Sequence, residues 1–198
     1  LINEYLDEVF PEIAMQSQDP VKRHAAKLWT KRIDQVVHPA AFVITYAIGP
    51  RTIILNQPEE VRERNIAEIP DPQRRATRRS VIDHGVKAPE FATAIRAFVD
   101  LIDAMEAQLV PGAWLAGETF GLADACILPY VLRLDQLAMQ SLLTTSARPN
   151  VNDWYTRVQA RPSYKTAVSD WLAEPVLQLF RTNGEAVWAE VEPLTRAE

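Results

Sequence analysis

The sequence contains a single cysteine, Cys126, and only six glycines among its 198 residues. One cysteine excludes an internal disulfide, which fits a reducing compartment and excludes a disulfide-stabilised scaffold. Cys126 stands in an apolar stretch at residues 122–134. That setting predicts a buried structural thiol, with a reactive nucleophile as the alternative.

Long hydrophobic runs and an excess of positive charge are also lacking. The longest apolar run, residues 40–48, contains Thr45 and Tyr46 and falls well short of the ~20 residues that a membrane-spanning helix needs. No secretory signal pattern opens the chain. The 26 acidic residues outnumber the 21 basic ones. We therefore expect a cytoplasmic protein with neither nucleic acid nor a membrane as its partner.

The common catalytic motifs are missing as well. The chain has no G-x-S-x-G, no phosphate-binding glycine loop, no H-E-x-x-H and no C-x-x-C. Its three histidines, His24, His38 and His84, have no second histidine or cysteine three or four residues on, so no helical zinc pair is expected. Spacing alone indicates a helical domain with no metal site and supplies no nucleophile paired with a base.

What the sequence does contain is helical periodicity over nearly its whole length. Strand-like alternation is absent, and the 14 prolines fall mostly between periodic segments. Asp19 and Pro20 fit the N-cap and first position of a helix reaching about residue 48, which Pro39 should kink. After Pro89, an apolar stripe predicts one buried helix face: Phe91, Ile95, Phe98, Ile102, Met105 and Leu109.

Further helices are predicted from about residue 122, at 151–160 and at 163–172, with a last helix or packed arm after Pro175. Residues 51–88 carry two helix-start signals and predict two short helices. The fold class is therefore all-α, a helical bundle with an inserted helical segment at about 51–88. The basic run at Arg74, Arg75, Arg78 and Arg79 predicts a solvated helix face, or a surface for an acidic partner.

Residues 114–125, WLAGETFGLADA, resemble the segment leading into the sixth helix of the glutathione S-transferase family. Residues 148–154, RPNVNDW, and 161–164, RPSY, resemble the ending of its helical domain. The opening, residues 1–7, resembles the end of the family's thioredoxin-like domain, and residues 19–29 resemble the start of its C-terminal helical domain.

Asp124 has a structural interpretation that does not depend on the family. It stands three residues after Gly121, where a carboxylate can accept the backbone N–H of the helix cap. Because the family usually has Ser or Thr at the cap, glycine there predicts a loss of about a few tenths of a kcal/mol. A catalytic carboxylate is the alternative role for Asp124.

The resemblance implies a glutathione S-transferase that uses the glutathione thiolate, as co-substrate, against a small hydrophobic electrophile. In the family, the thiol-activating Tyr, Ser or Cys belongs to the thioredoxin-like domain, so no catalytic residue is expected in this chain. Since the chain opens on Leu1 without a Met, we expect it to be part of a longer protein. The resemblance further implies a homodimer and a role in detoxification.

The electrophile-binding residues that the resemblance implies lie mainly on the first long helix. His38, Phe42 and Tyr46 follow one face at i+4 steps, and a histidine at the position of His38 faces the glutathione sulfur in bacterial beta-class enzymes. Packing residues and a surface histidine are the alternative interpretation. Trp171 is a further candidate. The same resemblance divides the chain into a remnant of a thioredoxin-like domain (1–9), a linker (10–18), the helical domain (19–175) and an extension (176–198).

The segments Trp29-Thr30-Lys31 and 69–73 are similar to a narrower subgroup, the bacterial β-etherase-like transferases, which cleave aryl ether bonds with glutathione. The competing hypothesis is a non-catalytic interaction or assembly module of glutathione-transferase-like fold, because fold alone does not fix function.

Overall fold

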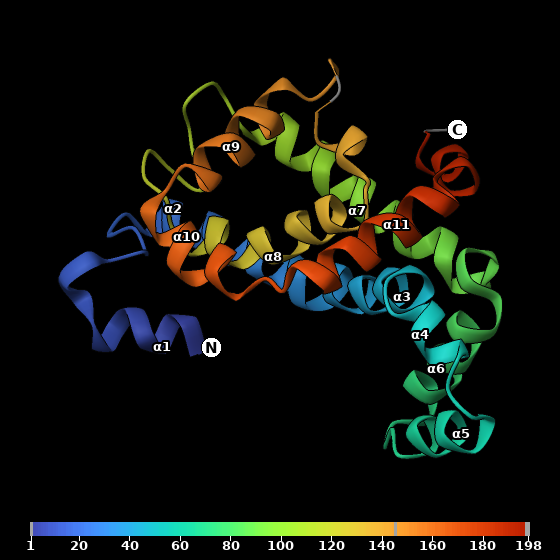
Figure 1. Cartoon of the computed structure of the whole chain (residues 1–198). Coiled ribbons are helices and arrows are strands. Elements are labelled where there is room, and N and C mark those ends of the chain that lie inside the picture. The colour runs from blue at the N-terminus through green and yellow to red at the C-terminus, as the bar shows by residue number, and fades with distance from the viewer. Residues whose placement is uncertain (1, 145, 197–198) are drawn as a thin grey trace.

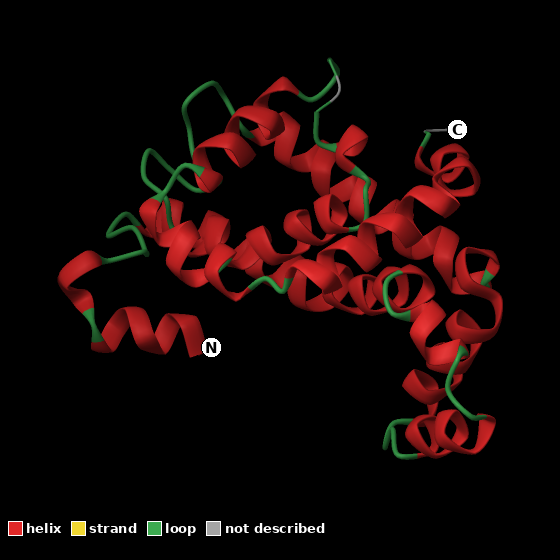
Figure 2. Cartoon of the chain, viewed as in Figure 1, coloured by secondary structure: helices red, strands yellow, loops and turns green. Residues whose placement is uncertain are grey.

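The computed structural model describes residues 2–144 and 146–196, and all of their regular structure is helical (Figure 1, Figure 2). No β-strand occurs among these residues, which confirms the predicted all-α class. The α-helices are α1 Ile2–Val9, α2 Pro20–Arg32, α3 His38–Ile48, α4 Arg51–Leu55, α5 Glu59–Ala67, α6 Pro72–His84, α7 Pro89–Gln108, α8 Leu122–Gln136, α9 Pro149–Gln159, α10 Pro162–Ala167 and α11 Glu174–Val191.

Helices α2 and α3 form one continuous helix, interrupted by a π-helical turn at Ile33–Val37. Asp19 caps its start, as predicted, since its Oδ1 accepts the backbone N–H of Val21 at 2.8 Å. The wider turn lies directly before Pro39, the position of the predicted kink. A proline ring crowds the preceding turn and removes a donor, and the π turn relieves both without ending the helix.

The core lies where α3 packs against α7. The predicted stripe of α7 is buried along its whole length, with Phe91, Ile95, Phe98, Ile102 and Met105 at 0% exposure. The central part of α3 contributes Ile44, also at 0%. Burial of these side chains, at about 1.5–3 kcal/mol each, is what holds the two helices together.

The inserted segment at 51–88 contains the two predicted helices, α5 and α6, and also the short α4 that the sequence patterns did not predict. In Figure 1, α5 projects from the body at the end farthest from α9. The guanidinium of Arg51 donates to the carbonyl oxygens of Ile82 and Asp83, at 2.9 and 3.0 Å, and so joins the two ends of the insertion.

The prediction of a solvated arginine face on α6 is only partly right. Arg79 is exposed and forms an ion pair with Glu63, and Arg74 is also exposed. Arg75 and Arg78 are half-buried. The guanidinium of Arg75 donates to the carbonyl oxygen of Ile69 at 2.8 Å, and so joins the first turn of α6 to the segment that precedes it.

The C-terminal segment packs on the body as a helix, one of the two forms predicted for it. Gly184 of α11 lies against the carbonyl of Leu137, so close that a Cβ there would overlap the oxygen. The side-chain amide of Asn183 donates to the carbonyl of Gly49 at 2.6 Å. The expected boundary between the helical domain and the C-terminal extension, between residues 175 and 176, falls inside one continuous helix, α11.

Helix α1 has no buried residue and lies at the edge of the molecule in Figure 1. Its Asn3 amide donates to Cys126 Sγ at 3.4 Å. The cysteine is half-buried, so it is less enclosed than the buried structural thiol that the sequence predicts. Within residues 2–144 and 146–196, no helix is both long and apolar enough to cross a bilayer.

Candidate functional site

A broad groove of about 1140 Å³ runs along the open face of α3. Gln35, Pro39 and Phe42 form its floor, α8 borders one side through Tyr130 and Arg133, and α6 and α7 border the other. Most of the other lining side chains are small or apolar, among them Val36, Ala41, Val43 and Ala97. A concave, largely apolar surface with a few polar groups at its edges is the usual form of a small-molecule site.

His38 and Phe42, two of the predicted site residues, both line this groove. His38 lies 3.0 Å, through Nδ1, from the hydroxyl of Tyr130 on α8. Burial raises the pKa of Tyr130, reinforced by the nearby charge of Asp34. The phenol therefore keeps its proton at neutral pH, and the hydrogen bond forms with either ring tautomer of His38: the hydroxyl donates to Nδ1, or it accepts Nδ1–H.

Tyr46, the third predicted residue, packs against Phe42 with ring centroids 5.0 Å apart but does not line the groove. The guanidinium of Arg78 covers it, 3.2 Å from the Tyr46 centroid and 4.3 Å from that of Phe42. Burial lowers the pKa of Arg78, yet the group stays a cation because an arginine pKa lies far above neutrality. Tyr46 thus supports the floor of the groove from one side.

Trp171, the fourth candidate, lies outside the groove. Its side chain is 81% exposed, and its indole N–H donates to the carbonyl of Thr166 at 2.9 Å. The structure thus does not bring Trp171 together with His38 and Phe42.

Among the groove residues that the sequence patterns missed are Tyr130, Arg133 and Arg74. Helical periodicity predicts that Tyr130 lies on the apolar face of its helix and that Arg74 lies in solvent. It does not show which other helix packs against that face, so it could not place either side chain in a groove. One sequence feature could have indicated the groove: Tyr130 and Arg133 are three residues apart and so share one helix face. That feature points to a groove only when α3 is known to lie beside α8, and this contact joins segments distant in the sequence.

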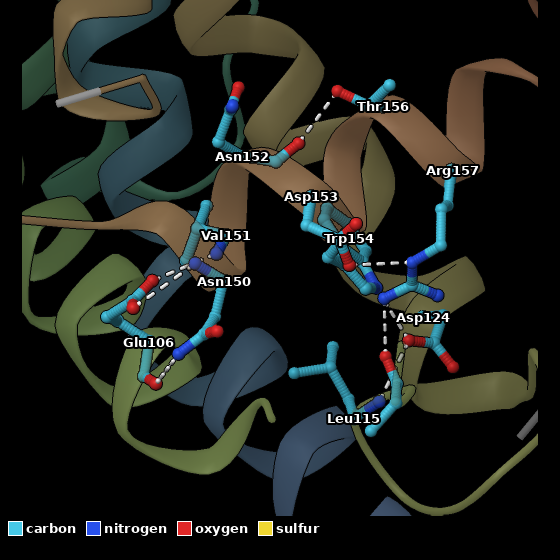
Figure 3. A network of polar contacts seen from close by, with 11 residues as sticks. Glu106, Leu115, Asp124, Asn150, Val151, Asn152, Asp153, Trp154, Thr156 and Arg157 are labelled. Atoms are coloured by element: carbon cyan, nitrogen blue, oxygen red, sulfur yellow. Dashed lines mark hydrogen bonds and ion pairs between the residues drawn. The ribbon is translucent and has the colours of Figure 1, made fainter. Parts of the chain in front are cut away.

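Asp124 acts in the framework that holds α8, away from the groove. It is fully buried, and three donors converge on its carboxylate: the backbone N–H groups of Gly121 and Leu115, at 3.0 and 3.1 Å, and Trp154 Nε1 at 2.8 Å. Figure 3 shows Leu115 and Trp154 converging on Asp124 from the loop before α8 and from α9. Burial raises the pKa of Asp124, partly offset by these donors.

A second carboxylate ties α9 to α7. Glu106 accepts the backbone N–H groups of Asn150 and Val151 at 3.2 and 2.9 Å, which satisfies the first turn of α9 from outside the helix (Figure 3). Each of these two carboxylates accepts backbone N–H groups at the start of a helix. For Asp124 this is the structural role that the sequence predicts.

Comparison with known proteins identifies the domain. Residues 60–157 match the family model described as glutathione S-transferase, C-terminal domain. The chain carries the C-terminal helical domain of the glutathione S-transferase family. Helices α7, α8 and α9 fall largely within the matched region, whereas the groove residues of α3 lie before it.

Two relatives extend the match beyond this segment of the glutathione S-transferase domain. The chain is 32% identical over 157 residues to tetrachloro-p-hydroquinone reductive dehalogenase from Sphingobium chlorophenolicum, covering 75% of this chain and 61% of that protein. It is 25% identical over 170 residues to protein LigF from Sphingobium sp. (strain NBRC 103272 / SYK-6), covering 83% of this chain and 66% of that one. The chain thus spans less than two thirds of either relative.

A solved structure shows the same fold. The crystal structure of beta-etherase LigF from Sphingobium sp. strain SYK-6 superposes with a TM-score of 0.72 at 24% identity, covering 84% of this chain and 70% of that one. This likeness confirms the all-helical architecture of a glutathione S-transferase C-terminal domain.

Proposed function

We propose that this chain supplies the electrophile-binding part of a glutathione transferase that acts on a hydrophobic electrophile. The observation that carries the proposal is the groove on α3, where His38 and Phe42 lie together beside Tyr130. The relatives support it, because one is named for a chlorinated hydroquinone, an aromatic compound, and another is a beta-etherase.

In this function, glutathione is the co-substrate and its thiolate forms a new C–S bond at the electrophilic carbon. The leaving group departs with its bonding electron pair. The groove contributes orientation and desolvation: Phe42 offers a ring face to an apolar acceptor, and the imidazole of His38 provides a polar group at the rim. Activation of the thiol is assigned to a thioredoxin-like domain, as the family resemblance implies.

Further proposals rest on the family and not on this groove. The protein works as a homodimer, in the cytoplasm, with a role in detoxification. Its expected domain division is a thioredoxin-like remnant at 1–9, a linker at 10–18, the helical domain at 19–175 and an extension at 176–198. Trp171 stays a candidate contact for the electrophile. Because it lies outside the groove, only a longer substrate, or a groove completed by a second subunit, would reach it.

The test is glutathione-dependent turnover of chlorodinitrobenzene by the protein at its full native length. We expect His38→Ala to lower kcat/KM about tenfold, with the far-UV spectrum unchanged, because one positioned polar contact contributes on that order. The matched control is His24→Ala, an exposed histidine on the same long helix that does not line the groove. Unchanged turnover and unchanged glutathione affinity in His38→Ala would remove its role.

A protein that neither binds glutathione nor turns over the electrophile would leave the competing hypothesis, an interaction or assembly module of the same fold. That outcome would reject the transferase proposal as a whole and not only the part assigned to His38.

A further inference from the structure

Two guanidinium groups reach the groove from opposite sides. Arg74 comes from α6 and Arg133 from α8, and both line the cavity. In the part of the chain that the structure describes, no carboxylate lies within ion-pair distance of either one, and neither side chain donates a hydrogen bond. Several other arginines do have acceptors, such as Arg79 with Glu63 and Arg148 with Asp103.

Arg133 is the more telling of the two because it is half-buried. Burial lowers its pKa, and the nearby Tyr46 opposes that change. On its other side, the guanidinium carbon lies 5.2 Å from the centroid of the Phe180 ring of α11. The Phe180 ring thus packs near this cation, while its N–H groups have no acceptor among residues 2–144 and 146–196. Holding an unpaired cation partly out of water is unfavourable, and an anion bound there would offset that penalty.

Phe42 is the aromatic side chain of the groove floor, and the guanidinium carbon of Arg74 lies 5.7 Å from its ring centroid. Tyr46 packs against Phe42 from outside the groove and lies near Arg133. Arg78 does not compete for a ligand, because it lies across the Phe42 and Tyr46 rings and is not a lining residue. The groove therefore combines a flat apolar surface with positive charge at its edges.

One lining carboxylate, Glu90, opposes this charge among the described residues. Glu90 Oε2 accepts the hydroxyl of Ser80 at 2.8 Å on the side of the groove formed by α6 and α7. Two cations against one anion leave the lining positive, although the whole chain has a net charge of −5. A positive groove in an acidic protein concentrates small anions.

We propose that the preferred electrophile of this groove is an aromatic compound that carries a carboxylate. Its ring lies on Phe42, and its carboxylate accepts charge-assisted hydrogen bonds from Arg133, with Arg74 adding attraction from the opposite side. This inference rests on the proposed transferase function, whose substrate class it narrows from hydrophobic electrophiles to aromatic acids.

The test compares two electrophiles that differ in one group, chlorodinitrobenzoate and chlorodinitrobenzamide, with glutathione and the protein at its full native length. In both, the thiolate attacks the ring carbon that bears chlorine, the C–S bond forms, and chloride leaves with the bonding pair. Each enzymatic rate is divided by the uncatalysed rate, because the two rings differ in intrinsic reactivity. We expect kcat/KM to favour the carboxylate about tenfold.

The arginine variants locate this preference. Arg133→Gln should remove most of the tenfold preference, and Arg74→Gln about twofold to threefold of it, because an exposed charge is screened by water and salt. Arg79→Gln is the matched control, since it removes a charge from the same helix as Arg74 but outside the groove. Arg133→Lys, which keeps the charge, should retain part of the preference and guards against a misfolded Gln variant.

A binding measurement separates this inference from the proposed function. Nitrobenzoate and nitrobenzamide lack the leaving chloride, so titration calorimetry reports their affinities without turnover. Tighter binding of nitrobenzoate that is lost in Arg133→Gln supports the aromatic-acid site even if no transferase activity is found. Turnover of both chloro compounds with equal preference overturns the inference and leaves the transferase proposal intact. A raised KM for glutathione in Arg133→Gln, with the carboxylate preference unchanged, would assign the cation to a glutathione carboxylate and also overturn it.

Discussion

The indole N–H of Trp154 donates to the buried carboxylate of Asp124 at 2.8 Å, across 30 residues of sequence. This bond fixes α9 against the first turn of α8 (Figure 3). The same carboxylate also accepts the backbone N–H groups of Gly121 and Leu115. Three separate segments thus depend on one side chain, on the helix that borders the groove through Tyr130.

Asp124→Ala should lower the free energy of unfolding by about 3 kcal/mol or more, because three buried donors lose their acceptor. Denaturant unfolding measures this difference. Asp153→Ala is the control, since Asp153 is only half-buried and pairs with Arg157 on its own helix, and its loss should stay below about 1 kcal/mol. Equal effects of the two substitutions would contradict the framework role.

Gly121→Ser should destabilise the protein by about 1–2 kcal/mol, although serine is the better cap residue in general. A Cβ on Gly121 would stand 2.7 Å from the carbonyl oxygen of Met15, and that carbonyl already accepts the N–H of Leu122 at 3.1 Å. The clash outweighs the few tenths of a kcal/mol that a hydroxyl cap adds. A rise in the midpoint of thermal unfolding would show that the Met15 segment yields easily.

Gly184→Ala should destabilise the protein by about 2 kcal/mol or more, despite the higher helix propensity of alanine. The new methyl group would overlap the carbonyl of Leu137 and push α11 away from the end of α8. Gly117→Ala is the matched control, because a methyl group at that position would have Lys22 Cδ as its nearest neighbour, at 3.7 Å. Thermal unfolding of the two variants gives the comparison, and a stabilised Gly184→Ala would refute the close packing.

Cys126 should react slowly with iodoacetamide at neutral pH. Burial raises the pKa of its thiol, the Asn3 amide opposes this, and the nearby acids Asp34 and Glu4 add to it. Because only the thiolate reacts, the rate should climb at a higher pH in the folded protein than in the chain unfolded with guanidinium chloride. The raised pKa also makes the stability of the protein depend on pH. The thiol of the unfolded chain ionises from about pH 8.5, before the thiol of the folded protein, so the free energy of unfolding falls as the pH rises above that value. Coincident pH profiles would show that the thiol has an ordinary environment.

Local rules of the sequence were enough for most of the helices. Asp19 followed by Pro20 starts α2, Asp71 followed by Pro72 starts α6, and Pro89 starts α7, because capping and the fixed φ of proline act within a few residues. The buried stripe of α7 also followed from spacing alone. The short α4 was missed because it follows a Gly-Pro stop directly and has no side-chain cap hydrogen bond to announce it.

The site depended on contacts between distant segments. His38 meets Tyr130 across 92 residues, and Arg78 turns onto Phe42 and Tyr46 instead of toward solvent. From the sequence, an arginine on α6 is a surface charge, since hydropathy does not distinguish water from an aromatic ring as its neighbour.

The sequence by itself determined that this chain is helical, where most of its helices begin, which face of α7 is buried, and that its motifs match the glutathione S-transferase helical domain. All but the last follow from short-range capping, proline geometry and a 3.6-residue period. Only the tertiary structure decided that glycine suits position 121 beside Met15, and that Arg133 faces a groove instead of an acid. The reason is physical: both depend on which atoms of a remote segment occupy the adjoining space, and no local pattern encodes that.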